Sequence, residues 1–379
     1  MPRPTRHTFT FTGWRLKSDT SSNPTIYASL KNATGDKQFV AMWRQNTVTG
    51  LTSGSRTIST NEQALNYSSI TSGTSNVTIN SNVTIIAFIG QSNNSRILQI
   101  IANNGSSNLI IYFENFRMSA VAGGSSSTGG TGINAGSRTV ELRVIGSNYI
   151  YGGNGGNATY TGGNGGNGGN AITASRVSLK YSTTSSSMDI RGGRGGNGMY
   201  GSSGSSGWAG RDGSYGTSAR HGGNGTSGYN GSKGGNGGNG GYAIQGSFSQ
   251  LNSGNLYLYG GDGGNGANGG RGGDGGRGGD GQNRNGGLFA GESNWAGNGG
   301  NGGNGGRGGD GGNAGNGQYA VSTNSSLGYR GWAGSRGYAG SYGWGGRQGY
   351  GGSGITGGSN GRAGSNGSWG YDGAYGSGR

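Results

Sequence analysis

The stretch GGDGGNGANGGRGGDGGRGGDG, from Gly260 to Gly281, decides how most of this chain folds. Glycine occupies every third position without exception, and a second glycine follows it in most triplets. A period of three is that of the polyproline-II helix, which rises roughly 3.1 Å per residue and has no internal hydrogen bonds. Two of its three edges are bare backbone here, so neighbouring main chains can touch.

Two other structures share this composition, and the sequence disfavours both. A collagen triple helix needs proline at about 15–20% or more, whereas this chain has 3 prolines in 379 residues. A disordered glycine-rich linker needs glycine but does not need it in register, that is, at every third position over many triplets. Here glycine keeps its phase from Gly192 to Gly240 except at Ala219, and from Gly328 to Gly376 except at Ile355. Such register predicts contact along one edge.

The length of these runs predicts that they reverse direction. A continuous polyproline-II helix from Gly192 to Gly240 would span on the order of 150 Å, which no compact domain holds. We therefore expect the chain to fold back near Gly201–Gly213 and near Arg220–His221, where paired glycines give way to larger residues.

Composition limits the possible function classes. Hydrophobic residues make up 28% of the chain and cysteine is absent, so neither a large apolar core nor disulfides can hold all of it. The net charge of +15 is spread thinly, which favours weak attraction to an anionic surface over a nucleic-acid groove. No apolar run approaches a membrane span. The N-terminus lacks the apolar stretch of a signal peptide, so we expect synthesis in the cytoplasm.

Residues 1–118 have ordinary glycine content and short apolar runs separated by Asn, Ser, Gly and Thr clusters. Strands at such spacing predict an all-β domain of the sandwich or jelly-roll type. The runs Val83–Ile89 and Leu109–Phe113 are long enough to be central strands buried on both faces.

Residues 119–379 repeat a unit in which a short apolar β segment leads into glycine triplets and then into Ala with Ile or Val. Repeats of this kind predict stacked layers. We expect short β turns stacked into a small solenoid with Ile172, Ile244 and Val321 inward, continued by a bundle of polyproline-II helices. The chain is expected to contain almost no α-helix.

Catalytic and metal chemistry have few candidates. The G-x-G-x-x-G matches follow from glycine density and lack the strand, helix and acidic residue of a dinucleotide site. Arg and Asp alternate in the third column of Gly260–Gly281, which favours solvated ion pairs over a calcium repeat. The candidate carboxylates for glycoside cleavage are Glu141, Asp189 and Glu292, and no pair of carboxylates stands in a recognisable frame. No enzyme activity, cofactor or metal is expected.

Aromatic residues lie mostly where the glycine doublets stop. Large rings cannot enter a glycine-lined interior, so they must cover its sides or project from its ends, and Tyr and Trp beside Ser, Gly and Asn are typical of binding surfaces. We expect exposed loops at Gln282–Ala296 and Gly201–His221. The candidate receptor-binding residues are Trp208, Arg211, Tyr215, Arg284, Phe289, Trp295, Tyr342, Trp344, Trp369 and Tyr371.

The blocks GGNGGNGGN-AI, GGNGGNGG-YAI and GGDGG resemble the distal tail-fibre adhesins of T-even-type bacteriophages, over roughly residues 150–379. The resemblance implies a sandwich of polyproline-II helices built from Gly162–Asn170, Gly234–Gly241, Gly260–Gly281 and Gly299–Gly317, with recognition loops between them. Residues 1–118 depart from the family's fibre-attachment domain, and this chain is longer. The glycine columns assigned a structural role are those of Gly165, Gly168, Gly237, Gly263, Gly266, Gly269, Gly272, Gly275, Gly278, Gly303 and Gly306.

The resemblance implies a non-enzymatic adhesin at the tail-fibre tip of a virion. Its loops would bind a bacterial outer-membrane protein or lipopolysaccharide, and residues 1–118 would join a tail-fibre protein or copies of the same chain. Nucleic acid and membrane insertion are not expected. The alternative is a structural subunit of an extracellular or virion filament, and a glycine-rich ice-binding surface is disfavoured by the basic charge and the aromatic content.

Overall fold

The computed structural model describes residues 9–18, 20, 38–45, 48–50, 54–61, 63–66, 74–91, 97–105, 108–213, 220–282, 296–351, 353 and 357–378. Within these ranges the regular secondary structure is β-strand, with no helix, as the sequence predicts. It follows that no described segment is a helix of the length and apolarity that crossing a bilayer requires.

The described strands form one two-stranded antiparallel sheet and one large, mostly parallel sheet. Their bounds are β1 Phe9–Leu16, β2 Phe39–Gln45, β3 Val48–Gly50, β4 Gly54–Ile58, β5 Gln63–Asn66, β6 Thr74–Ile79, β7 Ile85–Gln91, β8 Ile97–Ala102, β9 Leu109–Ser119, β10 Ile133–Asn134, β11 Thr139–Ile145, β12 Ser147–Tyr151, β13 Ile172–Tyr181, β14 Ser187–Arg191, β15 Ile244–Gln250 and β16 Asn255–Tyr259. The strands β1 and β2 pair only with each other.

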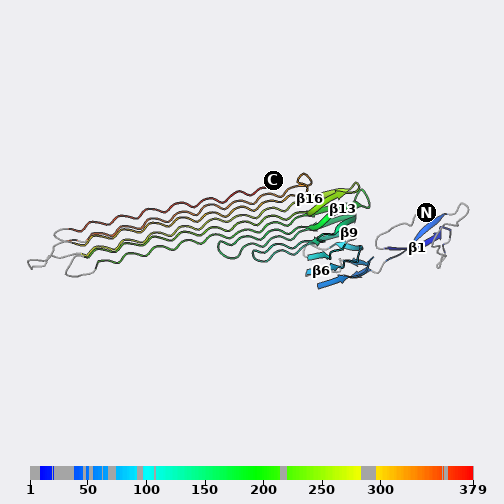
Figure 1. Ribbon diagram of the computed structural model, residues 1–379, viewed down its shortest axis with the longest axis horizontal. Coiled ribbons are helices and arrows are strands. Elements are labelled where there is room, and N and C mark those ends of the chain that lie inside the picture. Colours follow the sequence, from blue (N-terminus) through cyan, green and yellow to red (C-terminus); the bar gives the residue numbers. More distant parts are fainter. Residues whose placement is uncertain are drawn as a thin grey trace, which may run out of the picture.

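The parallel strands form three ladders around a common core, so the chain winds as a solenoid (Figure 1). The first ladder runs β3, β5, β7, β9, β11, β13 and β15. The second runs β4, β6, β8, β10, β13 and β15. The third runs β9, β12, β14 and β16. Long strands such as β13 take part in two ladders because each coil turns a corner within them.

The solenoid interior is filled by alternate residues of each strand. In β11 the pattern alternates strictly between buried and half-buried side chains, as expected when one face of a strand points inward. Ile172 pairs with Ile244, and Ile244 forms a bridge with Val321; all three are fully buried. The prediction that these three residues point inward is therefore confirmed.

The region before Ser119 differs from the expected sandwich. Sandwich strands are antiparallel, whereas the pairings of β3 to β9 are parallel and continue into β11 and β12. The predicted boundary at 118 falls inside β9. The apolar run at Leu109–Phe113 is not buried on both faces, because Ile110 and Tyr112 are half-exposed on the outside of the coil. Apolar runs identify strands but do not reveal strand direction.

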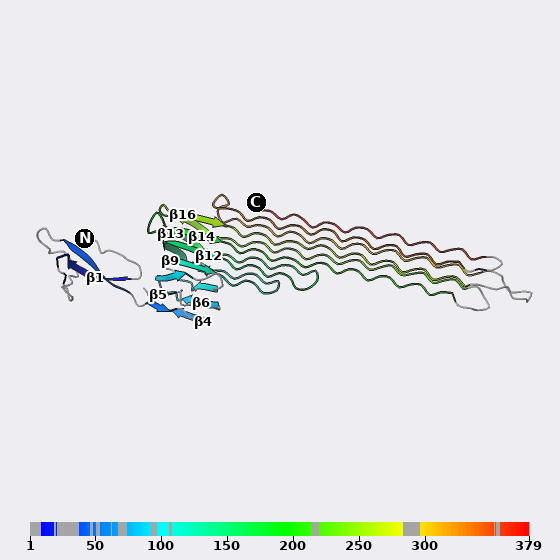
Figure 2. The same cartoon turned by 180° about the vertical axis from the view of Figure 1, so that it is seen from behind.

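Five glycine-rich hairpins leave the solenoid at one corner, where the third ladder ends and the second begins (Figures 1 and 2). We number them by their residues: hairpin 1 is 120–132, hairpin 2 is 152–171, hairpin 3 is 192–243, hairpin 4 is 260–320 and hairpin 5 is 331–377. Each has an outgoing and a returning segment. The run from Gly192 reverses once, between Gly213 and Arg220, close to one of the two positions predicted.

Backbone hydrogen bonds join these segments to one another in two directions. Within hairpin 4, the Gly303 N–H donates to the Gly276 carbonyl 2.8 Å away, which links the outgoing and returning segments. Between hairpins, the Gly275 N–H donates to the Trp344 carbonyl of hairpin 5 at 2.8 Å. Both patterns recur every three residues along hairpin 4, so two of the three N–H groups in each of its triplets are satisfied by neighbouring main chains.

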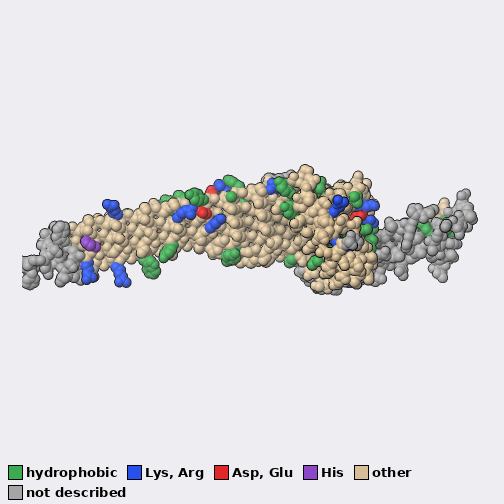
Figure 3. Space-filling view, in the orientation of Figure 1, with side chains coloured by type: hydrophobic (Ala, Val, Ile, Leu, Met, Phe, Trp, Pro, Cys, Tyr) green, Lys and Arg blue, Asp and Glu red, His purple; other side chains and the backbone are tan. Residues whose placement is uncertain are grey.

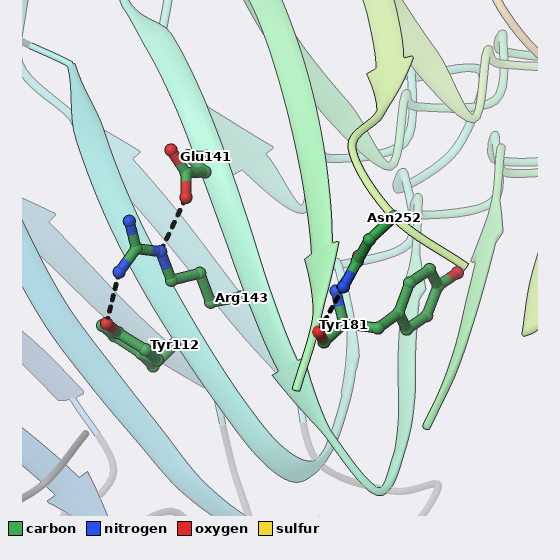
Figure 4. Close-up of polar contacts among 5 residues, drawn as sticks. All are labelled: Tyr112, Glu141, Arg143, Tyr181 and Asn252. Carbon is green, nitrogen blue, oxygen red and sulfur yellow. Dashed lines mark hydrogen bonds and ion pairs between the residues drawn. The ribbon is translucent and has the colours of Figure 1, made fainter. Parts of the chain in front are cut away.

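One buried hydroxyl in the solenoid has no partner among the described residues. The backbone N–H of Tyr181 donates to the carboxamide oxygen of Asn252, and the carboxamide nitrogen of Asn252 donates to the Tyr181 carbonyl, each at 2.7 Å (Figure 4). The Tyr181 ring is 2% exposed, its hydroxyl makes no described hydrogen bond, and burial raises the pKa of that hydroxyl.

We expect Tyr181→Phe to leave the free energy of unfolding unchanged or to raise it by up to about 1 kcal/mol, because it removes a desolvated group without breaking a hydrogen bond. Tyr112→Phe is the matched control. The Tyr112 hydroxyl accepts a hydrogen bond from Arg143 at 2.7 Å (Figure 4), so its loss should lower stability by about 0.5 kcal/mol. Thermal unfolding followed by circular dichroism measures both, and a marked loss in Tyr181→Phe would contradict the assignment.

Candidate functional site

Glycine in the hairpins stands where another hairpin or segment lies against the main chain. A Cβ placed on Gly275 would lie 1.9 Å from the Gly303 carbonyl oxygen, and one on Gly276 would lie 1.9 Å from the Trp208 carbonyl oxygen. Real Cβ atoms do not approach so closely. The same holds, at 1.9 to 2.2 Å from a carbonyl oxygen, for Gly165, Gly168, Gly237, Gly263, Gly266, Gly269, Gly272, Gly278, Gly303 and Gly306.

The third position of each triplet carries the polar column, and its side chains hold the next layer in place. The Asn197 carboxamide oxygen accepts the Asn265 N–H at 2.9 Å, and the Asn265 oxygen in turn accepts the Ser335 N–H at 2.8 Å. These bonds take up the third N–H of the triplet, the one that neighbouring carbonyls leave free. Asn and Asp therefore serve here as acceptors between hairpins, a role that the sequence analysis did not assign to them.

The arginines of the column pair with aspartates one triplet away, as predicted. Arg271 contacts Asp274 at 2.6 Å and Arg307 contacts Asp310 at 2.6 Å; Arg277 and Asp280 form a third such pair. These pairs are exposed and each contributes little stability. The same aspartates also accept hydrogen bonds from backbone N–H groups of hairpin 5. The ion pairs therefore hold in place the carboxylates that join hairpin 4 to hairpin 5.

These contacts lower two carboxyl pKa values. The Arg277 guanidinium and then the Tyr350 N–H hold the pKa of Asp280 below its ordinary 3.8, and the Tyr371 N–H and then Arg307 do the same for Asp310. A carboxylate whose folded-state pKa is depressed stabilises the fold above its ordinary pKa, and this stabilisation is lost as the pH falls through the folded-state pKa.

We expect the backbone amide of Tyr350 to lose part of its protection from hydrogen exchange when the pH is lowered from about 5 to about 3, after correction for the intrinsic exchange rate. Asp280→Asn is the control, because the carboxamide keeps an acceptor oxygen but does not titrate in this range. Equal pH dependence of Tyr350 protection in the two proteins would contradict the assignment.

Large side chains appear where the covering hairpin ends. Hairpin 2 extends only to about Tyr160. Where it lies against hairpin 3, the residues of hairpin 3 that face it, at 193 and 196, are glycines. Beyond that point the same position is occupied, in order, by Met199, Ser202, Ser205, Trp208 and Arg211. The indole of Trp208 is 77% exposed. The backbone N–H of Trp208 donates to the Thr226 hydroxyl at 2.6 Å, so a side chain replaces the missing hairpin as hydrogen-bond acceptor.

Hairpin 5 shows the same change at alternate triplets of its outgoing segment, and no described segment covers its outer side. The position that is glycine throughout outgoing hairpin 4 becomes Arg336, Tyr342 and Gln348 in hairpin 5, alternating with alanine or glycine, and the returning segment carries Asn366, Trp369, Asp372 and Tyr375. Figure 3 shows hydrophobic side chains along both long margins of the glycine-rich part.

Four aromatic residues of hairpin 5 stand at every second triplet of its polar column. We call Trp332, Tyr338, Trp344 and Tyr350 the aromatic row; they are 60%, 63%, 56% and 60% exposed. Their backbone N–H groups donate to the side chains of Asp262, Asn268, Asp274 and Asp280 at 2.7 to 2.9 Å. The backbone beneath each ring is therefore held by the hairpin below.

A cluster of rings joins the two segments of hairpin 5. Tyr342 meets Trp344 edge to face at 5.4 Å between ring centroids and meets Trp369 at 5.5 Å. Arginines stack on neighbouring tyrosines, with Arg307 at 4.9 Å from the centre of the Tyr371 ring and Arg336 at 4.2 Å from that of Tyr375.

The predicted receptor-binding residues do not form one site. Trp208 and Arg211 lie on the side of hairpin 3 that hairpin 2 leaves uncovered, within a straight segment rather than a loop. Tyr342, Trp344, Trp369 and Tyr371 lie on hairpin 5, at the other end of the stack. Tyr215, Arg284, Phe289 and Trp295 lie outside the described residues, as does most of the Gln282–Ala296 segment.

The sequence analysis did not assign Trp332, Tyr338 and Tyr350 to the binding surface. Their position within the glycine triplet is the signal that could have identified them. In hairpin 5 they occupy the position of the triplet that holds Asp262, Asn268 and Asp280 in hairpin 4. An aromatic residue in that position marks a hairpin that has no further layer to hold.

The acidic residues considered for catalysis are engaged elsewhere. Glu141 pairs with Arg143 at 2.6 Å, the buried Asp189 pairs with Arg191 at 2.7 Å, and Glu292 lies outside the described residues. Among the residues that the structure describes, no three His, Asp or Glu side chains gather as a metal site would require. Comparison of the chain with protein-family models, with curated proteins and with solved structures finds no match.

Proposed function

We propose that this chain is a receptor-binding adhesin of a bacteriophage tail-fibre tip, which displays its binding surface on a bundle of polyproline-II helices. The observation that carries the proposal is the distribution of side chains on the hairpins: glycine where a neighbour covers the main chain, and Trp, Tyr, Arg, Ser and Asn where none does. Rigid aromatic residues beside small polar ones are typical of recognition surfaces.

The polyproline-II assignment has two supports. The hydrogen bonds and the side-chain positions both repeat every three residues, and the described backbone hydrogen bonds of hairpins 3 to 5 join different segments rather than neighbours within one. Both features are those of this helix, which cannot bond to itself. A bundle of this kind supports exposed side chains without an apolar core.

The two ends of the molecule suit different partners. In Figure 1 the β1–β2 pair lies beyond the solenoid, at the end away from the hairpin tips. A role in joining a fibre therefore suits the first 47 residues, which precede β3, better than the whole of 1–118, since β3 to β9 are part of the solenoid. The receptor would be an outer-membrane protein or lipopolysaccharide.

Binding to bacteria tests the proposal. We expect purified, fluorescently labelled protein to bind the surface of some strains in a panel of Gram-negative bacteria and to inhibit infection of those strains by the phage that carries it. A protein lacking residues 1–47 should still bind cells but should no longer join the fibre. Electron microscopy that shows long homopolymers, together with no binding to any strain, would contradict the adhesin and support the filament.

A further inference from the structure

The outer face of hairpin 5 is closed to any further glycine hairpin. In hairpin 4 the N–H groups on the equivalent side donate to carbonyls of the next hairpin, as Gly275 does to Trp344. In hairpin 5, side chains of the returning segment take up such groups: Asn366 accepts the Gly345 N–H at 2.9 Å and Asp372 accepts the Ala339 N–H at 2.9 Å. Tyr342 and Trp369 occupy positions where a covered segment has glycine. A second copy of the chain therefore cannot continue the stack on this face.

The aromatic row is a linear array rather than a compact patch. Successive rings are six positions apart in the chain, which corresponds to about 19 Å at the rise of a polyproline-II helix, and the row extends over roughly 56 Å. Each ring is more than half exposed, and the main chain at each ring is bonded to hairpin 4. Such an array suits an extended ligand with recurring flat groups better than the folded surface of a protein.

The residues between the rings favour sugars over nucleic acid. The positions between the four rings are Ser335, Ser341 and Arg347, two hydroxyls and one cation. Single-stranded nucleic acid needs basic side chains along its whole path as well as stacking rings. The C–H face of a pyranose carries partial positive charge and stacks on the negative face of an aromatic ring, and its hydroxyl groups pair with serine and carboxamide side chains.

We infer that the aromatic row of hairpin 5, with Trp369 at its side, binds an extended polysaccharide chain of the bacterial surface. This inference rests on the proposed function and specifies its receptor. The ring faces hold sugar residues at intervals along the chain, and Arg347 accommodates an occasional acidic sugar or phosphate.

An array of immobilised bacterial polysaccharides tests the inference directly. We expect the full-length protein to bind one or more of them, and Tyr338→Ala/Trp344→Ala to bind them at least tenfold more weakly. Tyr200→Ala, which removes an equally exposed ring from hairpin 3, is the matched control and should bind like the wild type. Equal thermal unfolding of the three proteins shows that the variants fold. Binding to no polysaccharide, or undiminished binding by the double variant, would overturn the inference, as would tighter binding to an oligo-dT strand.

Outer-membrane vesicles from a strain that the protein binds separate this inference from the proposed function. Periodate cleaves the vicinal diols of sugars, so it should abolish binding to the vesicles, whereas digestion with proteinase K should not. The reverse result identifies a protein receptor, which overturns the polysaccharide inference and leaves the adhesin intact. Binding to the array without binding to any bacterial strain would instead count against the adhesin.

Discussion

Gly275→Val should destabilise the hairpin bundle by about 3 kcal/mol. The first atom of the new side chain would lie 1.9 Å from the Gly303 carbonyl oxygen and 2.5 Å from its carbon. Both are main-chain atoms held by hydrogen bonds on either side, so they cannot move aside as a flexible side chain would. The two segments of hairpin 4 must separate locally, and the bonds from Gly275 to Trp344 and from Gly303 to Gly276 are lost with them.

The measurement is hydrogen exchange of the backbone amides of hairpins 4 and 5, with thermal unfolding followed by circular dichroism. Gly124→Val is the matched control, because a Cβ at Gly124 meets no atom within 4 Å. We expect its melting and its exchange to equal those of the wild type. Valine is preferred to alanine because Ala267 and Ala314 already occupy two positions of the glycine columns, where the bundle is built around a methyl group. A wild-type exchange pattern in Gly275→Val would show that the segments are not in contact.

Arg138→Met should destabilise the solenoid by about 3 kcal/mol. Arg138 is 1% exposed, although its side chain is charged. Its guanidinium donates to the Val83 carbonyl at 2.6 Å and lies 3.5 Å from the carbonyls of Asn80 and Asn103, in the turns of the coils below. Burial lowers the pKa of this guanidinium. Methionine fills similar space but leaves the carbonyl of the buried Val83 without this donor, and a buried carbonyl costs free energy when unpaired.

Arg143→Met provides the comparison on a partly exposed arginine of the same solenoid. Arg143 bonds to Glu141 and Tyr112 on the outside of the coil, where water replaces the lost partners (Figure 4). We expect a loss below about 1 kcal/mol. Urea unfolding followed by circular dichroism gives both values. A smaller loss for Arg138→Met than for Arg143→Met would show that the buried guanidinium does not hold the coils together.

The sequence alone determined the features that depend on local period. Glycine at every third position predicted segments in main-chain contact, and the Ala-Ile and Ala-Val repeats predicted the inward residues Ile172, Ile244 and Val321. The alternation of Arg and Asp in the column from Gly260 to Gly281 predicted their pairing, since an offset of three residues returns to the same edge. These features follow from neighbours along the chain.

Only the tertiary structure decided what depends on distant segments. Strand direction in 48–119 could not be read from apolar runs, because parallel and antiparallel strands bury the same alternate residues. The burial of Arg138 depends on carbonyls 35 to 58 residues earlier in the chain. Whether a ring is exposed depends on how far the neighbouring hairpin reaches, as at Trp208, or on whether a further hairpin follows, as at Trp344. Glycine is required only where another main chain lies in contact.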